Sequence, residues 1–259
     1  MPDPSALRPW PDCPLVVAYG LGVDSTAMLI EFARRGIRPD LILFADTGGE
    51  KPETYSYLSI IRPFLARAGF PDVIVVRYQP KWAAYRTLEG QSLHTGTLPS
   101  LAYGGKSCAL KFKRQPQDNY VADWEPARVC WARSDKVLKA IGYDAGPADS
   151  RRHRYEEDDY YRYWYPLAEW HFDREHCKEI ISAAGLPVPM KSACFYCPAS
   201  KKEEIVWLRE HHPDLLERAL TIERNAQAKL TSVKGLGRSF SWSSYLDRRY
   251  SLPLFDNCG

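Results

Sequence analysis

The chain has 259 residues, 45% of them hydrophobic, and its 35 Lys and Arg exceed its 32 Asp and Glu to give a net charge of +3. These fractions are typical of a globular protein, and an aromatic content of 13% excludes a disordered chain. No stretch approaches the roughly 20 apolar residues that span a bilayer, and residues 1–14 lack the apolar segment of a signal peptide. We therefore expect a cytoplasmic protein without a membrane partner.

The first part of the chain alternates between short apolar runs and helical patterns. Three apolar runs predict buried strands: 15–19, 41–45 and 73–76. The helical patterns between them end at Gly36 and near Gly69, and Pro52 fits the first turn of the second helix. This alternation predicts a parallel α/β sheet, in which ligands bind beyond the carboxyl ends of the strands.

The rest of the chain is less regular, and residues 81–106 predict a lid or linking region. A fourth strand is expected at 137–141. Four helices are expected at 117–124, 173–184, 203–210 and 215–229. Together the patterns predict an α/β domain over 1–186, with a parallel, doubly wound, Rossmann-like sheet. A helical, cysteine-bearing extension is expected over 187–259.

A glycine-containing turn, Gly20-Leu21-Gly22-Val23-Asp24-Ser25-Thr26, connects the first predicted strand to the first helix. A Walker A phosphate loop is excluded because the turn has no lysine. A dinucleotide-binding turn would place its third glycine at Ser25, while Asp46 ends the second strand where a ribose-binding acid would lie. Besides the dinucleotide-binding turn, two other interpretations remain open. One is a plain turn with an aspartate cap, and the other is a loop of the Ser-Gly-Gly-x-Asp-Ser type, which acts on the α-phosphate of adenine nucleotides.

The last interpretation has a physical basis. Small residues let backbone N–H groups approach phosphate oxygens, and the helix that follows presents its positive end to them. Ser25 and Thr26 add hydroxyl donors. Asp24 would repel a phosphate unless it caps the helix or helps to hold a cation.

Three motifs occur together in one order: the turn, the segment Phe44-Ala-Asp46-Thr47-Gly48-x-Glu50-x-Pro52-Glu53-Thr54, and Cys194-x-x-Cys197. In this combination the chain resembles the phosphoadenosine-phosphosulfate reductase-like branch of the PP-loop, or adenine nucleotide alpha hydrolase, superfamily. Further matches are Cys108-x-x-Lys111-x-x-x-x-Pro116 and Pro166-Leu167-x-Glu169-Trp170. The resemblance covers roughly residues 14–210 and implies a HUP-type fold. Where the family has a serine and a second glycine, this loop has Gly20 and Leu21.

The resemblance also implies two groups of site residues. Nucleotide binding would involve Tyr19, Gly20, Gly22, Val23, Asp24, Ser25, Thr26, Asp46, Thr47, Gly48, Gly142 and Arg152. Catalysis would involve Asp24, Ser25 and Lys111, with Mg2+ and backbone N–H groups stabilising charge. Reductases of the family use a C-terminal cysteine followed by glycine as the nucleophile on sulfur. Cys258 therefore has three open interpretations, as that nucleophile, as a metal ligand or as a residue without a role.

The cysteines suggest a metal centre. Seven cysteines without an export signal do not predict a disulfide framework. Cys194-x-x-Cys197 precedes a predicted helix, whose N-terminal end would lower the thiol pKa values. A tetrahedral site needs two more ligands, and the resemblance brings Cys108 near the pair. Cys13, Cys130 and Cys177 are expected to be packing residues.

Three thiolates would leave one coordination position open, so the resemblance to thiolating family members implies a [4Fe–4S] cluster. Closure of the site by Cys258 is an alternative. A structural zinc ion with one of His176, His211 and His212 and the absence of a metal are two others.

Two segments could contact anions or nucleic acid. Basic residues surround Cys108, and they are either a solvated loop or a site that neutralises phosphate: Lys106, Lys111, Lys113 and Arg114. Arg151, Arg152 and Arg154 could bind a sulfate or phosphate in bidentate fashion. The aromatic run at 160–165 could stack on bases, although burial in the core is favoured.

The sequence thus predicts an enzyme that binds ATP or a related adenylate, exposes its α-phosphate to attack and transfers sulfur through the cysteine centre. Its partners would be the nucleotide, a sulfur donor or thiol reductant, and an acceptor that the sequence leaves open among a small molecule, tRNA and DNA. Thiol-dependent reduction of an adenylyl sulfate is the nearest alternative. A nucleotide-binding module without turnover is the third hypothesis.

Overall fold

The computed structural model describes residues 8–147, 149 and 157–250. Its contacts divide the chain into two compact units, one of residues 1–46, 51–76 and 114–192 and the other of residues 47–50, 77–113 and 193–259. The chain enters the second unit for the last time at residue 193. Residues 77–113 belong to the second unit, although the sequence patterns group them with the first domain.

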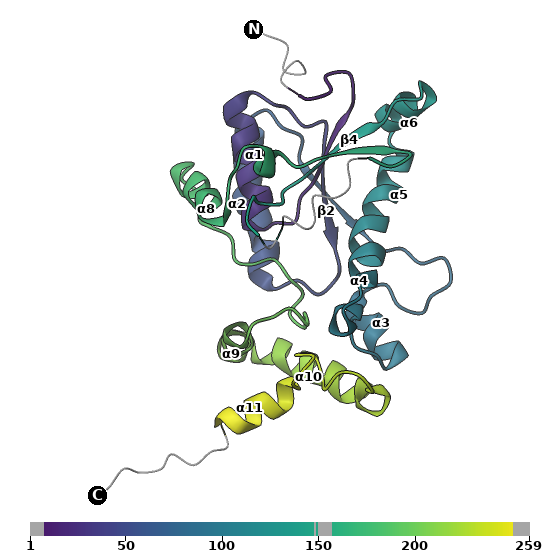
Figure 1. The fold of residues 1–259 in the computed structure, drawn as a ribbon, viewed down its shortest axis with the longest axis vertical. Coiled ribbons are helices and arrows are strands. Elements are labelled where there is room, and N and C mark those ends of the chain that lie inside the picture. Colours follow the sequence, from purple (N-terminus) through teal and green to yellow (C-terminus); the bar gives the residue numbers. More distant parts are fainter. Residues whose placement is uncertain (1–7, 148, 150–156, 251–259) are drawn as a thin grey trace, which may run out of the picture. The chain divides into compact units, whose positions relative to one another are not determined.

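A five-stranded sheet in the order β3-β2-β1-β4-β5 forms the centre of the first unit (Figure 1). Its strands are β1 (Leu15–Ala18), β2 (Leu41–Asp46), β3 (Val73–Arg77), β4 (Val137–Ile141) and β5 (Tyr161–Trp164). β1 pairs in parallel with β2 and β4, and β4 pairs in parallel with β5. The predicted parallel α/β sheet is confirmed, and its four predicted strands begin and end within one residue of their expected bounds.

Helices cover both faces of this sheet (Figure 1). One face carries α1 (Val23–Arg35), α2 (Pro52–Arg67), α7 (Pro166–Glu169) and α8 (Arg174–Ala183), and the other carries α5 (Gln115–Asp123) and α6 (Glu125–Ala132). Alternate strand residues face opposite layers: Val17 and Ile42 pack with α1, whereas Val16 and Leu43 pack with α5 and α6. Because both faces are covered, β1 and residues Leu41–Ala45 of β2 are continuous apolar runs in the sequence.

The strand order reverses between β1 and β4. From β1 the chain adds β2 and β3 on one side, whereas β4 and β5 lie on the other. Ligands of doubly wound sheets bind at the carboxyl ends of the strands beside such a reversal. The glycine-containing turn leaves β1 at this point, and Gly142 follows β4.

The aromatic run at 160–165 contains β5, which the periodicity does not predict because polar and apolar residues do not alternate there. Tyr161 and Trp164 are buried in the two cores on opposite faces of the sheet. Tyr160 is exposed, and Tyr163 is half-buried. The favoured interpretation of this run, burial in the core, therefore holds for Tyr161 and Trp164.

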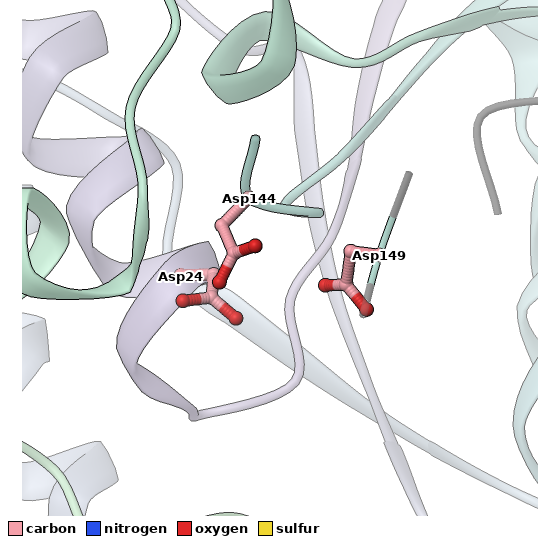
Figure 2. A group of neighbouring side chains, drawn as sticks. All are labelled: Asp24, Asp144 and Asp149. Atoms are coloured by element: carbon pink, nitrogen blue, oxygen red, sulfur yellow. The ribbon is translucent and has the colours of Figure 1, made fainter. Parts of the chain in front are cut away.

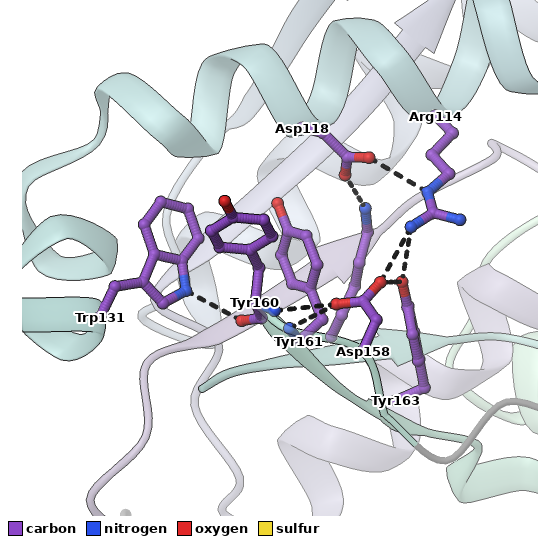
Figure 3. Close-up of polar contacts among 8 residues, drawn as sticks. Arg114, Asp118, Trp131, Asp158, Tyr160, Tyr161 and Tyr163 are labelled. Carbon is purple, nitrogen blue, oxygen red and sulfur yellow. Dashed lines mark hydrogen bonds and ion pairs between the residues drawn. The ribbon is translucent and has the colours of Figure 1, made fainter. Parts of the chain in front are cut away.

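Asp158 fixes the start of β5 through four hydrogen bonds (Figure 3). Its carboxylate accepts from the backbone N–H groups of Tyr160 and Tyr161 at 3.0 and 2.8 Å, from the Tyr163 hydroxyl at 2.6 Å and from Arg114 at 2.9 Å. Partial burial would raise the pKa of Asp158, but these donors outweigh it and lower that pKa. Asp158 is thus a charged anchor for an edge strand.

We expect Asp158→Asn to lower the free energy of unfolding at neutral pH by about 1–2 kcal/mol, since hydrogen bonds to a charged group are lost. Because the folded state lowers this pKa, the contribution is complete above the unfolded value of about 3.9 and disappears as the pH falls through the folded value. Urea denaturation between pH 7 and pH 3 measures it, with the exposed Asp159→Asn as the matched control. A difference that does not shrink toward pH 3 would contradict this assignment.

The second unit is mainly helical. Its helices are α3 (Leu88–Thr95), α4 (Ser107–Ala109), α9 (Lys202–His211), α10 (Pro213–Ala226) and α11 (Trp242–Tyr250), with 3-10 turns at Ser100–Tyr103 and Gln227–Lys229 and a π-helical turn at Leu110–Arg114. Phe112, Tyr196 and Trp242 are among the residues of its core. The expected lid at 81–106 includes α3, which packs on α10 in this unit. In the part of the chain that the structure describes, no helix is long and apolar enough to cross a membrane.

Candidate functional site

The turn after β1 is closed by Ser25. Its hydroxyl accepts a hydrogen bond from the backbone N–H of Gly20 at 3.2 Å and lies 3.4 Å from the carbonyl oxygen of Gly22. Helix α1 begins at Val23 with Gly22 as its N-cap, so Asp24 lies in the first helical turn and is not the cap. The N-cap Gly22 has no side chain to bond the amides of this first turn, so within the described residues these amides are uncapped and could bind an anion.

The buried side chain of Leu21 fixes the conformation of the turn. Its φ of +56° lies in the left-handed region, where the resembling loop has a glycine. That conformation costs a leucine about 1–2 kcal/mol. The side chain is fully buried in the core that includes α1, and burial of a leucine contributes about 1.5–3 kcal/mol. Burial therefore offsets the strain and fixes the conformation of the turn.

Two glycines of the predicted site permit close approach. A Cβ on Gly142 would lie 2.7 Å from the Cα atom and 2.8 Å from the backbone nitrogen of Ser25. A Cβ on Gly22 would lie 2.9 Å from the Ser192 hydroxyl, which can rotate away, whereas the backbone of Ser25 cannot. The end of β4 is thus in direct contact with the turn after β1, and only glycine fits at residue 142. Tyr19, fully buried below the turn, bonds the Thr26 hydroxyl at 3.1 Å.

Three carboxylates gather at this edge of the sheet, and Figure 2 shows them turned toward one another. One oxygen from each of Asp24, Asp144 and Asp149 lies within 4.8 Å of the others. Asp24 forms an ion pair with Arg174, the first residue of α8, through one oxygen. Its other oxygen, Oδ1, is buried and has no hydrogen-bond partner among the described residues. Asp144 accepts from the backbone N–H of Gly146 at 2.8 Å.

The negative charge of this aspartate group is only partly compensated. Burial raises the pKa of Asp24, Arg174 lowers it, and the neighbouring Asp144 and Asp149 raise it further. Oxygen-only ligand sets of this kind suit Mg2+. The orphaned Oδ1 of Asp24 is where a cation would satisfy a buried charge, so the residues present fit the expected Mg2+. Sequence reasoning had singled out Asp24 alone; Asp144, Asp149 and Arg174 became visible only through the fold.

Asp46, the predicted ribose-binding acid, ends β2 and is buried. Its carboxylate accepts a hydrogen bond from the Tyr55 hydroxyl at 2.6 Å. Tyr55 lies in the first turn of α2, so this bond fixes the carboxylate relative to the helix that follows. Asp46 is thus held in one orientation at the carboxyl end of the sheet.

The residues after Asp46 bind the first cysteine of the Cys-x-x-Cys motif within the second unit. The Thr47 hydroxyl lies 3.1 Å from the Cys194 sulfur, and Glu50 pairs with Cys194 as an isolated antiparallel bridge. The backbone N–H of Phe195 donates to the carbonyl of Gly49 at 2.8 Å. Gly48 adopts a φ of +75°, where a side chain would be strained. The second-strand motif and the cysteine motif are thus parts of one local structure.

Lys113, which the sequence placed only in the basic group around Cys108, contacts this local structure. Its ammonium lies 3.1 Å from Glu50, whose side chain is fully buried. Burial would lower the pKa of Lys113, but the Glu50 carboxylate and the Cys194 thiol outweigh it and raise the pKa. A lysine whose charged form is favoured therefore lies beside the cysteine. The predicted catalytic Lys111 instead donates to the Tyr85 hydroxyl at 2.8 Å and to Gln91 at 2.9 Å.

The three predicted metal ligands pack against one apolar core. Cys194 is buried, and Cys108 and Cys197 are half-buried at its border. The expectation of a lowered thiol pKa is wrong for Cys194, because burial raises its pKa to about 12. The reason is that α9 begins only at Lys202, so the helix N-terminus lies beyond the motif. The thiolate is the form of cysteine that binds a metal, so a metal at Cys194 would have to displace the thiol proton.

The described residues include just one group of three or more histidine, cysteine or carboxylate ligand atoms within 4.8 Å of one another, and it is the aspartate group. His176 stacks on Phe172, and His211 and His212 contact Trp207. Cys13, Cys130 and Cys177 are buried, as expected. The predictions for Arg152 and Cys258, and for Arg151 and Arg154, fall outside the described residues.

No protein-family model and no curated protein matches the chain. Among solved structures, it is similar to that of the U34-tRNA thiolase NcsA from Methanococcus maripaludis with its [4Fe–4S] cluster. The TM-score is 0.40 and the sequence identity 13%, over 91% of this chain and 80% of that chain. The reaction of the present chain is therefore argued from its own residues.

Proposed function

We propose that the protein is a PP-loop enzyme that acts at the α-phosphate of ATP or a related adenylate and transfers sulfur through a cysteine centre. The observation that supports this most is the meeting of three features at the reversal of the strand order. The glycine turn presents uncapped amides, Gly142 packs against it, and the aspartate group offers an orphaned oxygen. Phosphate and a cation would be bound there together.

The first half of the reaction is a displacement at phosphorus. An oxygen of the acceptor attacks the α-phosphorus, the bond to the bridging oxygen of the β-phosphate breaks, and pyrophosphate leaves with that electron pair. The amides at residues 22–25 would stabilise charge on the α-phosphate oxygens, and Asp24, Asp144 and Asp149 would hold Mg2+ for the departing pyrophosphate. Asp46 and Gly48 would contact the nucleoside. The product is an adenylated acceptor.

The second half replaces the adenylated oxygen by sulfur. A sulfide from the sulfur donor attacks the activated carbon, and AMP leaves with the oxygen. A [4Fe–4S] cluster on Cys108, Cys194 and Cys197 would supply an iron with an open position for that sulfide. Lys113 would favour anionic sulfur beside Cys194, because its ammonium stays charged.

The proposal predicts ATP turnover to AMP and pyrophosphate in the presence of an acceptor, and ATP–pyrophosphate exchange with total cellular RNA as the acceptor pool measures the first half. Turnover to ADP and phosphate, or tight binding of NADH at the turn, would contradict it. Thioredoxin-dependent release of sulfite from an adenylyl sulfate would favour the reductase alternative, in which the Cys258 thiolate attacks sulfur. Nucleotide binding without turnover in any of these assays would favour a binding module.

We expect Asp24→Asn to lower the exchange rate by about 100-fold or more, because the cation at the phosphates loses a charged ligand. Mn2+ binding, followed by electron paramagnetic resonance without nucleotide, should weaken in parallel. Arg174→Gln is the matched control, since it removes the same ion pair but keeps the carboxylate. Equal effects of the two variants on Mn2+ affinity would mean that Asp24 serves only the ion pair.

A further inference from the structure

Positive charge is concentrated in the second unit. That unit contains 16 Lys and Arg against 10 Asp and Glu, whereas the first contains 19 against 22. Within the second unit, residues 77–113 contain six Lys and Arg and one acid, Glu89. Glu89 is already paired with Arg218 at 2.5 Å. Residues 77–113 therefore form a basic segment with little opposing charge of its own.

This segment also exposes large apolar side chains. Trp82 is 96% exposed, an unusual state for the largest side chain because it is costly in water. Lys81 and Arg86 flank it and are exposed as well. Tyr103, Lys106 and Leu110 are exposed farther along the same segment. We call Lys81, Trp82, Arg86, Tyr103, Lys106 and Leu110 the Trp82 surface.

The two stretches that make up the Trp82 surface are held together by contacts of Lys111. Its ammonium donates to the Tyr85 hydroxyl and lies 4.9 Å from the centre of the Tyr78 ring. The next residue, Phe112, is fully buried and packs edge-on against Tyr78 at 4.9 Å. The loop that carries Trp82 is therefore fastened to the segment that carries Cys108, one of the proposed metal ligands.

We propose that the Trp82 surface binds an unpaired loop of RNA, with a base stacked on the Trp82 indole and phosphates near Lys81, Arg86 and Lys106. Aromatic rings among cations are the groups that bind single-stranded nucleic acid, because every base has a face for stacking and every nucleotide a negative charge. Acidic side chains of a protein would pair with the cations, but they have no flat ring to stack on the indole. Paired DNA keeps its bases stacked inside, whereas folded RNA presents unpaired bases in loops. RNA binding by the Trp82 surface does not depend on the proposed function. Only the assignment of this RNA as the sulfur acceptor rests on it.

The test is the binding of a fluorescently labelled RNA stem–loop to the full-length protein, followed by anisotropy. Trp82→Ala should weaken binding by about 5- to 150-fold, the range for loss of one stacked base, and Trp82→Phe should restore most of it. Quenching of tryptophan fluorescence by the RNA should be larger in the native protein than in Trp82→Phe. Tyr160→Ala, which removes an exposed aromatic ring from the first unit, is the matched control and should bind as the native protein does.

Charge and partner class are tested in the same assay. Lys81→Glu and Arg86→Glu should each reduce the slope of log affinity against log salt by about 0.7, while Arg67→Glu on α2 should not. Native affinity in Trp82→Ala, equal competition by poly-glutamate, or tighter binding of the DNA strand of the same sequence would each overturn the proposal. ATP affinity, measured separately with α,β-methylene-ATP, should be unchanged in all these variants. RNA binding without ATP binding would refute the proposed function and leave the Trp82 surface intact.

Discussion

Cys194→Ser should remove the metal from the protein and abolish sulfur transfer while leaving ATP–pyrophosphate exchange. Cys194 is the most deeply buried of the three proposed ligands, and its sulfur is already oriented by the Thr47 hydroxyl. A serine hydroxyl is a poor ligand for iron, so a cluster bound through Cys194 would be lost. Iron content should fall from about four per chain to near zero, together with the absorption near 400 nm.

The controls separate loss of the metal from loss of the fold. Cys130→Ala changes a buried cysteine of the first unit and should keep both iron and absorption. Cys108→Ser should lose the metal as completely as Cys194→Ser, because the two are proposed to share it. The ligand assignment is wrong if Cys108→Ser retains full iron, and the cluster itself is wrong if anaerobically purified native protein contains none.

Gly142→Ala should strongly weaken nucleotide binding through a steric effect on the turn. The new methyl group would lie 2.7 Å from the Cα atom of Ser25, so the start of α1 must move. We expect a loss of about 1–3 kcal/mol in the free energy of unfolding, the usual cost of overpacking. Affinity for α,β-methylene-ATP should fall by about 100-fold or more, because the amides would no longer converge on the phosphate. Calorimetry and urea denaturation measure the two effects.

Gly20→Ala is the matched control for stability. A Cβ at Gly20 has no neighbour closer than 3.8 Å, and its φ is not in the left-handed region. This variant should unfold at nearly the native urea concentration. If Gly142→Ala binds the nucleotide as tightly as the native protein, the turn does not hold the phosphate.

Much of the fold could be predicted because its signals are local. Apolar runs bounded by turn residues identify four strands, and Gly36 and Asp173 mark helix ends by their backbone chemistry. β5 could not be predicted, because Tyr161 and Trp164 belong to cores on opposite faces while the residues between them are only half-buried. Its start depends on Asp158 and Arg114, which are 44 residues apart.

The candidate site could be predicted only in part, for a related reason. The glycine turn, Asp46 and the Cys-x-x-Cys pair are contiguous motifs. Asp144 and Arg174 meet Asp24 only because the sheet brings the end of β4 and the start of α8 to the turn. Lys113 had no distinguishing sequence signal among neighbouring basic residues; its contact with the buried Glu50 spans 63 positions.

The conformation of Leu21 has a consequence for affinity. A glycine at this position would sample many conformations before a ligand arrives and would lose that freedom on binding. Here the buried side chain removes the alternatives when the chain folds. Nucleotide capture then carries a smaller entropic penalty, because folding has already fixed the conformation of the turn.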